Sequence, residues 1–163
     1  MTSEGGTDGD GEPAAVPGAV APLLRMTRLL VGVATEAVEQ LDTGVSLPQF
    51  RLLLVLSELG PMPSARAADR LGTAPSSVTR LADHLEAAGY LVRSRERPNR
   101  SVVRLAPTAA GTEIVERVLH RRATELDRLL AVLGPHEQTR LAQLVTRLCD
   151  GADAERGGHW SVL

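Results

Sequence analysis

Two neighbouring segments of the sequence carry residues suited to contacting a nucleic acid. In the first, residues 75–88, apolar and polar residues alternate at helical spacing, which predicts a helix with one buried and one polar side. The polar side holds Ser76, Ser77, Thr79, Arg80 and His84. Hydroxyls and amides near a helix N-terminus can hold phosphates, and an arginine fork fits guanine O6 and N7 in a major groove. A merely solvated helix has a similar face, so this segment alone leaves both interpretations open.

The second segment is strongly basic. Residues 93–104 contain five arginines against one glutamate, a net charge of +4 in a chain whose formal net charge is −2. Charge this concentrated is typical of a surface that follows a phosphate backbone. The arginines expected to contact DNA are Arg93, Arg95, Arg97 and Arg100. Arg100, near the expected hairpin tip, is suited to a narrow minor groove. The alternative is a basic hairpin that is only solvated.

The elements that must position these residues are helices and one short strand pair. Apolar runs at helical spacing are separated by capping and helix-breaking residues. The predicted helices cover residues 20–42, 47–59, 65–71, 75–88 and 109–133, with a last helix ending near residue 150. β-prone runs at 90–95 and 101–105 flank a turn-rich loop and predict a hairpin. The predicted fold class is mainly α with a small β-hairpin wing.

The two short helices, 65–71 and 75–88, are joined by a turn that contains Gly72, the signature of a helix-turn-helix. Asp83 and Glu86 lie one turn apart on the second helix. On a solvated helix we expect them to pair with nearby arginines rather than to act as catalytic carboxylates.

Three stretches of this region follow a known pattern. They are SLPQFRLLLVLSELGPM, AADRLGTAPSSVTRLADHLEAAGYLVR and the TAAG that opens the long helix. From Leu47 to about Leu148 the sequence resembles the MarR (multiple antibiotic resistance regulator) family of winged helix-turn-helix transcription factors. The sequence departs from the family pattern at the wing tip, where Asn99-Arg100-Ser101 stands in place of Asp-Arg-Arg. It also has Ala74 where a capping serine is common, so that Thr73 or no side chain caps the helix.

The resemblance implies a homodimeric, sequence-specific DNA-binding regulator, most often a repressor. A two-fold dimer is expected to bind a pseudo-palindromic operator. A cytoplasmic location is expected because no segment of the sequence resembles a targeting signal. The family's recognition-helix contacts correspond to Ser76, Ser77, Thr79 and Arg80, and its wing-tip arginine to Arg100. A small-molecule effector is expected between the dimerisation helices and the DNA-binding lobe. Its expected wall residues are Arg25, Arg28, Phe50, Arg51 and Leu54. A different class, a winged-helix protein-interaction module without DNA binding, is the alternative that the departures at the wing tip favour.

The domain division follows from these elements. The expected parts are a disordered acidic tail (1–18), an N-terminal dimerisation helix (19–45), the winged domain (46–107), C-terminal dimerisation helices (108–150) and a flexible tail (151–163). Long apolar stripes outside the winged domain independently favour a subunit interface, the alternative being packing within one chain.

Other functions find little support in the sequence. It has no phosphate-binding loop, nucleophile elbow or zinc-protease helix, so we expect neither an enzyme nor a cofactor. No two histidines have metal-ligand spacing within one helix, although His120 and His136 could meet in the fold. Cys149, the single cysteine, lies on an apolar stripe and is expected to act as a small hydrophobe. No apolar run approaches the roughly 18 residues of a membrane span, and no targeting segment is expected.

Overall fold

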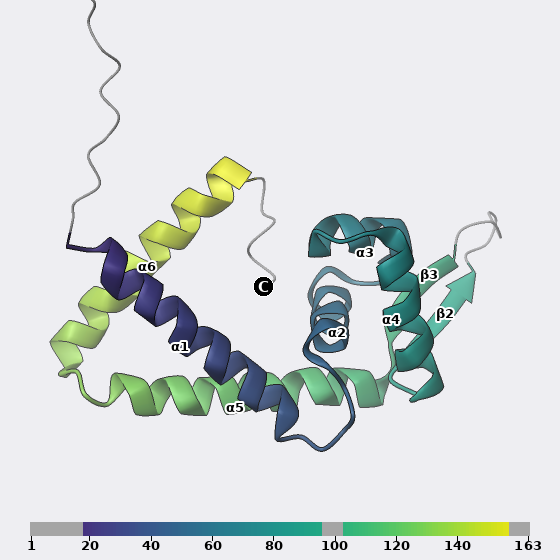
Figure 1. The fold of residues 1–163 in the computed structure, drawn as a ribbon, viewed down its shortest axis with the longest axis horizontal. Helices are drawn as coiled ribbons and strands as arrows, with labels where there is room; N and C mark the ends of the chain where they lie inside the picture. Colours follow the sequence, from purple (N-terminus) through teal and green to yellow (C-terminus); the bar gives the residue numbers. More distant parts are fainter. Residues whose placement is uncertain (1–17, 96–102, 157–163) are drawn as a thin grey trace, which may run out of the picture. The chain divides into compact units, whose positions relative to one another are not determined.

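The computed structural model describes residues 18–95 and 103–156 (Figure 1). The chain forms two compact units, and the boundary between Gly32 and Val33 lies inside helix α1 (Val20–Glu39). The described part of the first unit is therefore essentially the N-terminal part of α1. The second unit contains the remainder of α1 and every other described element.

The second unit alternates helices with short strands in the order of a winged helix-turn-helix. Its elements are α2 (Leu47–Leu59), β1 (Met62–Pro63), α3 (Ser64–Leu71), α4 (Pro75–Ala87), β2 (Leu91–Arg95), β3 (Val103–Pro107), α5 (Ala109–Leu130) and α6 (Pro135–Arg156). The predicted fold class, mainly α with a small β-hairpin wing, is confirmed. In the part of the chain that the structure describes, no helix has the length and apolarity needed to span a membrane.

The strands form an antiparallel sheet in the order β1-β3-β2. Leu91 of β2 pairs with Pro107 of β3, and Met62 of β1 pairs with Leu105 on the other side of β3. The β2–β3 hairpin agrees with the sequence prediction. The strand β1 was not predicted, because two residues carry no periodicity and their extended conformation depends on pairing with a distant strand. The hairpin loop, residues 96–102, lies outside the described residues.

Helix α2 is the centre of the core. Its residues Leu52 to Leu56 are all buried, as is Phe50 at its start. Helices α3, α4 and α5 and strand β3 all pack against it. A helix surrounded on all sides must be apolar all round, which explains why α2 reads as a nearly continuous leucine and valine run.

The turns around α3 and α4 follow the chemistry of their residues. Gly72 ends α3 in the left-handed conformation at φ +63°, and Gly89 follows α4 at φ +79°. These are backbone conformations that glycine adopts without steric cost. Pro75 is the first residue of α4, as predicted, and no side chain caps that helix at Ala74. Helix α3 begins at Ser64, one residue before the predicted start at residue 65, and Pro63 occupies the cap position.

Three predicted helix ends differ from the structure. Helix α1 ends at Glu39 rather than near residue 42, and α5 ends at Leu130 rather than near residue 133. The Gln138 amide donates to the carbonyls of Leu130 and Leu133, at 3.1 and 3.0 Å, and the Leu133 N–H also donates to the Leu130 carbonyl, at 2.9 Å. These bonds satisfy backbone acceptors where α5 ends. Helix α6 continues through Gly151 to Arg156, so the expectation of a flexible tail from residue 151 is wrong for 151–156. Glycine is tolerated inside a helix at a modest free-energy cost, and here it does not end one.

A close backbone contact joins the end of α4 to the start of α5. The Thr108 backbone N–H donates to the Tyr90 carbonyl at 3.0 Å, and the Thr108 hydroxyl donates to the Gly89 carbonyl at 2.8 Å. The same hydroxyl oxygen caps α5 by accepting from the Gly111 N–H at 3.1 Å. A Cβ at position 111 would lie 2.1 Å from the Tyr90 oxygen, so only glycine permits this approach. Thr108 and Gly111 of the TAAG motif are therefore required for the packing of α5 against the turn that follows α4.

We expect Gly111→Ala to lower the free energy of unfolding by roughly 1–3 kcal/mol, because the added methyl would collide with a backbone carbonyl that cannot rotate away. Urea unfolding followed by circular dichroism measures the change. Gly151→Ala in α6 is the control, since its Cβ would meet nothing within 4 Å, and alanine there should stabilise by up to about 1 kcal/mol. Equal stability of wild type and Gly111→Ala would contradict this account.

Candidate nucleic-acid interface

Helix α4 has the two sides that the sequence predicts. Val78, Ala82 and Leu85 are buried in the core, which fixes the rotation of the helix about its axis. The residues expected to contact DNA lie away from that side. Ser76, Thr79, Arg80 and His84 are exposed and Ser77 is half-buried. Their placement on one polar face agrees with the prediction, while their contacts with DNA remain a prediction.

A hollow of about 530 Å³ lies between α4 and the start of α2. Its lining residues are Gly44, Ser46, Pro48, Gln49, Thr73, Ser77, Arg80, Leu81 and His84. It places Arg80 and His84 beside the first turn of α2, where Gln49 accepts a hydrogen bond from the Ser46 N–H at 2.7 Å. The sequence does not place Ser46 and Gln49 at this site, because their proximity to α4 is a tertiary contact.

Arg93 of β2 points to the recognition helix. Its guanidinium donates to Asp83 Oδ1 at 2.6 Å and to Glu86 Oε2 at 2.7 Å, with a longer contact of 3.4 Å to the Thr79 carbonyl. The expectation that Asp83 and Glu86 pair with an arginine is confirmed. The hydrogen bond to Asp83 raises the pKa of Arg93, with further contributions from the charge of both carboxylates and against the opposing effect of burial. Both terminal nitrogens are thus engaged within the protein, so the phosphate contact expected of Arg93 finds no support in this arrangement.

Of the remaining wing arginines, the structure describes the side chain of Arg104 alone. Arg95 ends β2, but its side chain lies outside the described part of the structure, as do Arg97 and Arg100 altogether. Arg104 is half-buried on β3, opposite Ser94 in the hairpin register. The predicted contacts of Arg95, Arg97 and Arg100 therefore remain predictions.

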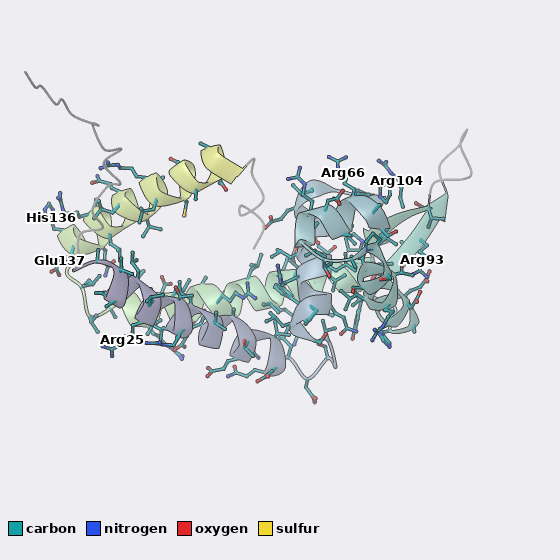
Figure 2. The ribbon with its side chains drawn as sticks, turned by 45° about the horizontal axis from the view of Figure 1, so that its top comes forward. Arg25, Arg66, Arg93, Arg104, His136 and Glu137 are labelled. Atoms are coloured by element: carbon teal, nitrogen blue, oxygen red, sulfur yellow. The ribbon has the colours of Figure 1, made fainter. Side chains whose placement is uncertain are left out.

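Helix α3 adds cations that sequence reasoning missed. Arg66 is exposed and Arg70 half-buried, one helical turn apart. Figure 2 shows Arg66 at the same edge of the winged domain as Arg104, whereas Arg93 lies beside α4. The first helix of a helix-turn-helix crosses the DNA backbone. The i, i+4 spacing of two arginines in that helix was the available signal.

The residues expected to line an effector cavity belong to both units of the chain, and each unit is described by itself. Phe50 and Leu54 are 0% and 4% exposed and belong to the core, and their expected contact with an effector remains a prediction. Both residues are buried because α2 lies at the centre of the core, where Phe50 and Leu52 to Leu56 are all packed. Arg51 is half-buried on the same helix, and Arg25 and Arg28 are exposed on α1 in the first unit.

Arg122 on α5 is a cation that sequence reasoning missed. Its guanidinium carbon lies 4.7 Å from the centroid of the Phe50 ring, and Nη2 makes a long contact of 3.5 Å to the Ala34 carbonyl. Its Nε is buried and has no acceptor among the described residues. Burial lowers the pKa of Arg122 because the charged form is partly desolvated. The signal was its spacing, since Arg122 continues the buried stripe of Ile114 and Val118 at intervals of four.

Metal and redox chemistry gain no residues from the fold. Among the described residues no three His, Cys, Asp or Glu side chains lie close enough to hold a metal ion. Cys149 is exposed in this single chain. The expected packing of its side chain as a small hydrophobe is therefore not seen among the described residues.

The fold and the polar face of α4 define a winged helix-turn-helix protein of the class that binds DNA. A family model described as the MarR family matches residues 43–100. The transcriptional repressor MdtR of Bacillus subtilis is 28% identical over 133 residues, which are 81% of this chain and 86% of that protein. The chain belongs to the MarR family of winged helix-turn-helix transcriptional regulators, and it is a DNA-binding regulator.

Solved structures share this fold. The crystal structure of RV1404 from Mycobacterium tuberculosis matches with a TM-score of 0.76 and 31% identity, covering 86% of this chain and 96% of that one. CouR from Rhodococcus jostii RHA1, solved with bound p-coumaroyl-CoA, matches with a TM-score of 0.65 and covers 86% of this chain and 94% of its own. At 20% identity CouR supports the fold alone.

Proposed function

We propose that the protein is a homodimeric repressor that binds a pseudo-palindromic operator and is released by a small anionic effector. The observation that carries the proposal is the polar face of α4, held outward by a fully buried opposite side. The repressor role is supported by the similarity to MdtR, whose name records that activity.

Base recognition is assigned to Arg80, with Ser76, Ser77 and Thr79 beside it. Arg80 is exposed and lies one turn into the recognition helix, where an arginine reaches base edges in a major groove. The Thr79 hydroxyl donates to the Pro75 carbonyl at 3.1 Å, which leaves its methyl group and its oxygen lone pairs for DNA. His84 and the basic residues of the wing and α3 are assigned to the phosphate backbone. The latter are Arg66, Arg95, Arg97, Arg100 and Arg104.

Dimerisation is assigned to the apolar faces that the chain leaves uncovered. On α6, Leu144, Val145 and Leu148 are 45%, 47% and 61% exposed, on one side of the helix. The N-terminal part of α1 is likewise apolar and exposed, at Val20, Leu23, Leu24, Met26, Leu29, Leu30 and Val31. Contiguous exposed apolar surface of this kind is characteristic of an interface. A two-fold dimer would set its recognition helices about one turn of duplex apart, ~34 Å.

An anionic effector is suggested by Arg122. A partly buried guanidinium with no carboxylate partner among the described residues is electrostatically incomplete, and a ligand carboxylate or phosphate would complete it. CouR offers a precedent within the fold, because p-coumaroyl-CoA carries phosphates. Release requires that the effector bind the form incompetent for DNA more tightly than the competent form.

We expect Arg80→Ala to weaken operator binding by ~1–3 kcal/mol and to relax the preference at one base position, since the bidentate hydrogen bonds to guanine are removed. Duplexes selected by the wild-type protein from a randomised pool, compared with scrambled duplexes at two salt concentrations, measure both effects. Arg140→Ala on α6 removes the same charge outside the winged domain and should leave the preference unchanged. Equal losses on selected and scrambled DNA would overturn the base-reading role. A wild type that binds no duplex even at low salt would favour a protein-interaction module instead.

Leu148→Glu should shift the protein from dimer to monomer, because a charge would be buried in an apolar interface. Sedimentation equilibrium measures the change. Gln143→Glu, on the opposite side of α6, adds the same charge and should leave the dimer intact. If both variants remain dimeric, α6 does not form the interface.

A compound that releases the wild type from DNA should lose at least about tenfold in potency against Arg122→Met. Methionine keeps an apolar stem against Phe50 and removes the charge-assisted hydrogen bonds that an anion would accept. Competition by aromatic carboxylates and acyl-CoA thioesters, followed by fluorescence anisotropy of labelled operator, tests this. Arg121→Met is the matched control, since Arg121 donates to Gln40 within the chain. Unchanged potency against Arg122→Met would remove Arg122 from the effector site.

A further inference from the structure

Arg93 connects the wing to the middle of the recognition helix. Asp83 and Glu86 are three residues apart on α4 and present their carboxylates on one side, at 2.6 and 2.7 Å from separate terminal nitrogens of Arg93. The third contact, at 3.4 Å, reaches the Thr79 carbonyl one turn nearer the N-terminus. One side chain of β2 thus spans about two turns of α4.

The covalent connection between α4 and β2 does not by itself hold the two elements at one angle. It is a short turn through Gly89, braced by a hydrogen bond from the Tyr90 N–H to the Leu85 carbonyl at 2.8 Å. That turn fixes only the C-terminal end of the helix. Arg93 acts farther along α4, where a small change of angle would displace the DNA-facing residues of its first turns most.

A phosphate contact would require Arg93 to give up these partners. Its side chain is 28% exposed, and each terminal nitrogen already donates to a carboxylate. The two carboxylates would also be left uncompensated on a helix that faces a polyanion. These contacts favour a role for Arg93 in ion pairs within the protein, even though it belongs to the basic segment of the sequence.

We propose that Arg93 is a positioning residue that holds the recognition helix and the wing strand at the angle where both fit one DNA site. The proposal rests on the proposed DNA-binding function. It predicts that removing the Arg93 ion pairs lowers sequence discrimination more than general affinity for DNA. A scrambled duplex can be bound by either element separately, whereas the operator requires both in register.

The test uses a charge-neutral double variant, Arg93→Gln with Glu86→Gln. We expect it to bind the selected duplex about tenfold more weakly, to change scrambled-duplex affinity less than about twofold, and to keep the wild-type salt dependence. Asp83→Asn should change discrimination in the same direction. The control is Arg128→Gln with Glu125→Gln, which removes an exposed ion pair of 3.1 Å on α5 and should leave discrimination unchanged.

An Arg93 that binds phosphate gives the opposite pattern. The double variant would then lose affinity equally on both duplexes, and the salt slope would fall by about 0.9 for each phosphate that is no longer neutralised. Asp83→Asn would free Arg93 and strengthen binding to both duplexes. This pattern would overturn the proposal.

A measurement without DNA separates this proposal from the function on which it rests. In the free protein, the double variant should exchange the backbone amides of β2 and the first half of α4 roughly tenfold faster than wild type, with an unchanged melting temperature to within a few degrees. Arg93→Lys should restore part of the protection, because a single ammonium can hold one carboxylate. Unchanged exchange would overturn the positioning role whether or not the wild type selects an operator, while a wild type that selects no sequence would overturn the proposed function alone.

Discussion

The approach of the α5 N-terminus to the Tyr90 carbonyl is the constraint on which the winged domain depends. It brings three chain segments, the end of α4, the start of β2 and the start of α5, within hydrogen-bonding distance of one backbone turn. Since a Cβ at Gly111 would lie 2.1 Å from that carbonyl, the packing has no room for adjustment. Helix α5 therefore leaves the winged domain in a direction set by the same turn that ends the recognition helix. Because this connection is rigid, a displacement of α5 would be transmitted to α4.

A second constraint comes from the central position of α2. Because α3, α4, α5 and β3 all pack on it, its apolar residues form the core. This is why Phe50 and Leu54 are buried in this structure. It also explains Arg122, whose guanidinium lies over the Phe50 ring and is partly desolvated without a carboxylate partner among the described residues. The fold thus leaves the Nε of Arg122 without an acceptor among the described residues, beside the ring of Phe50.

Local rules predicted the elements well, and tertiary contacts account for what they missed. Gly72, Pro75, Gly89 and Thr108 each end or begin an element as their backbone chemistry dictates. Strand β1 was missed because it exists only by pairing with β3. The two faces of α4 followed from helical periodicity, and so did the pairing of Asp83 and Glu86 with an arginine. Which arginine forms that pair could not be read from spacing, because ten residues of chain separate Arg93 from Asp83.

The arginines of the basic hairpin are therefore not equivalent. Counting charge along the sequence treats its arginines as equivalent, yet Arg93 is already neutralised by two carboxylates of α4. That pairing cancels negative charge on α4, the helix for which we propose DNA contacts. A regulator needs both effects, because general attraction to a polyanion brings it to DNA while a fixed angle between two reading elements distinguishes one site from another. An arginine that faces inward helps to fix this angle but adds nothing to the general attraction. It can therefore raise discrimination between operator and other sequences without strengthening the binding of non-specific DNA.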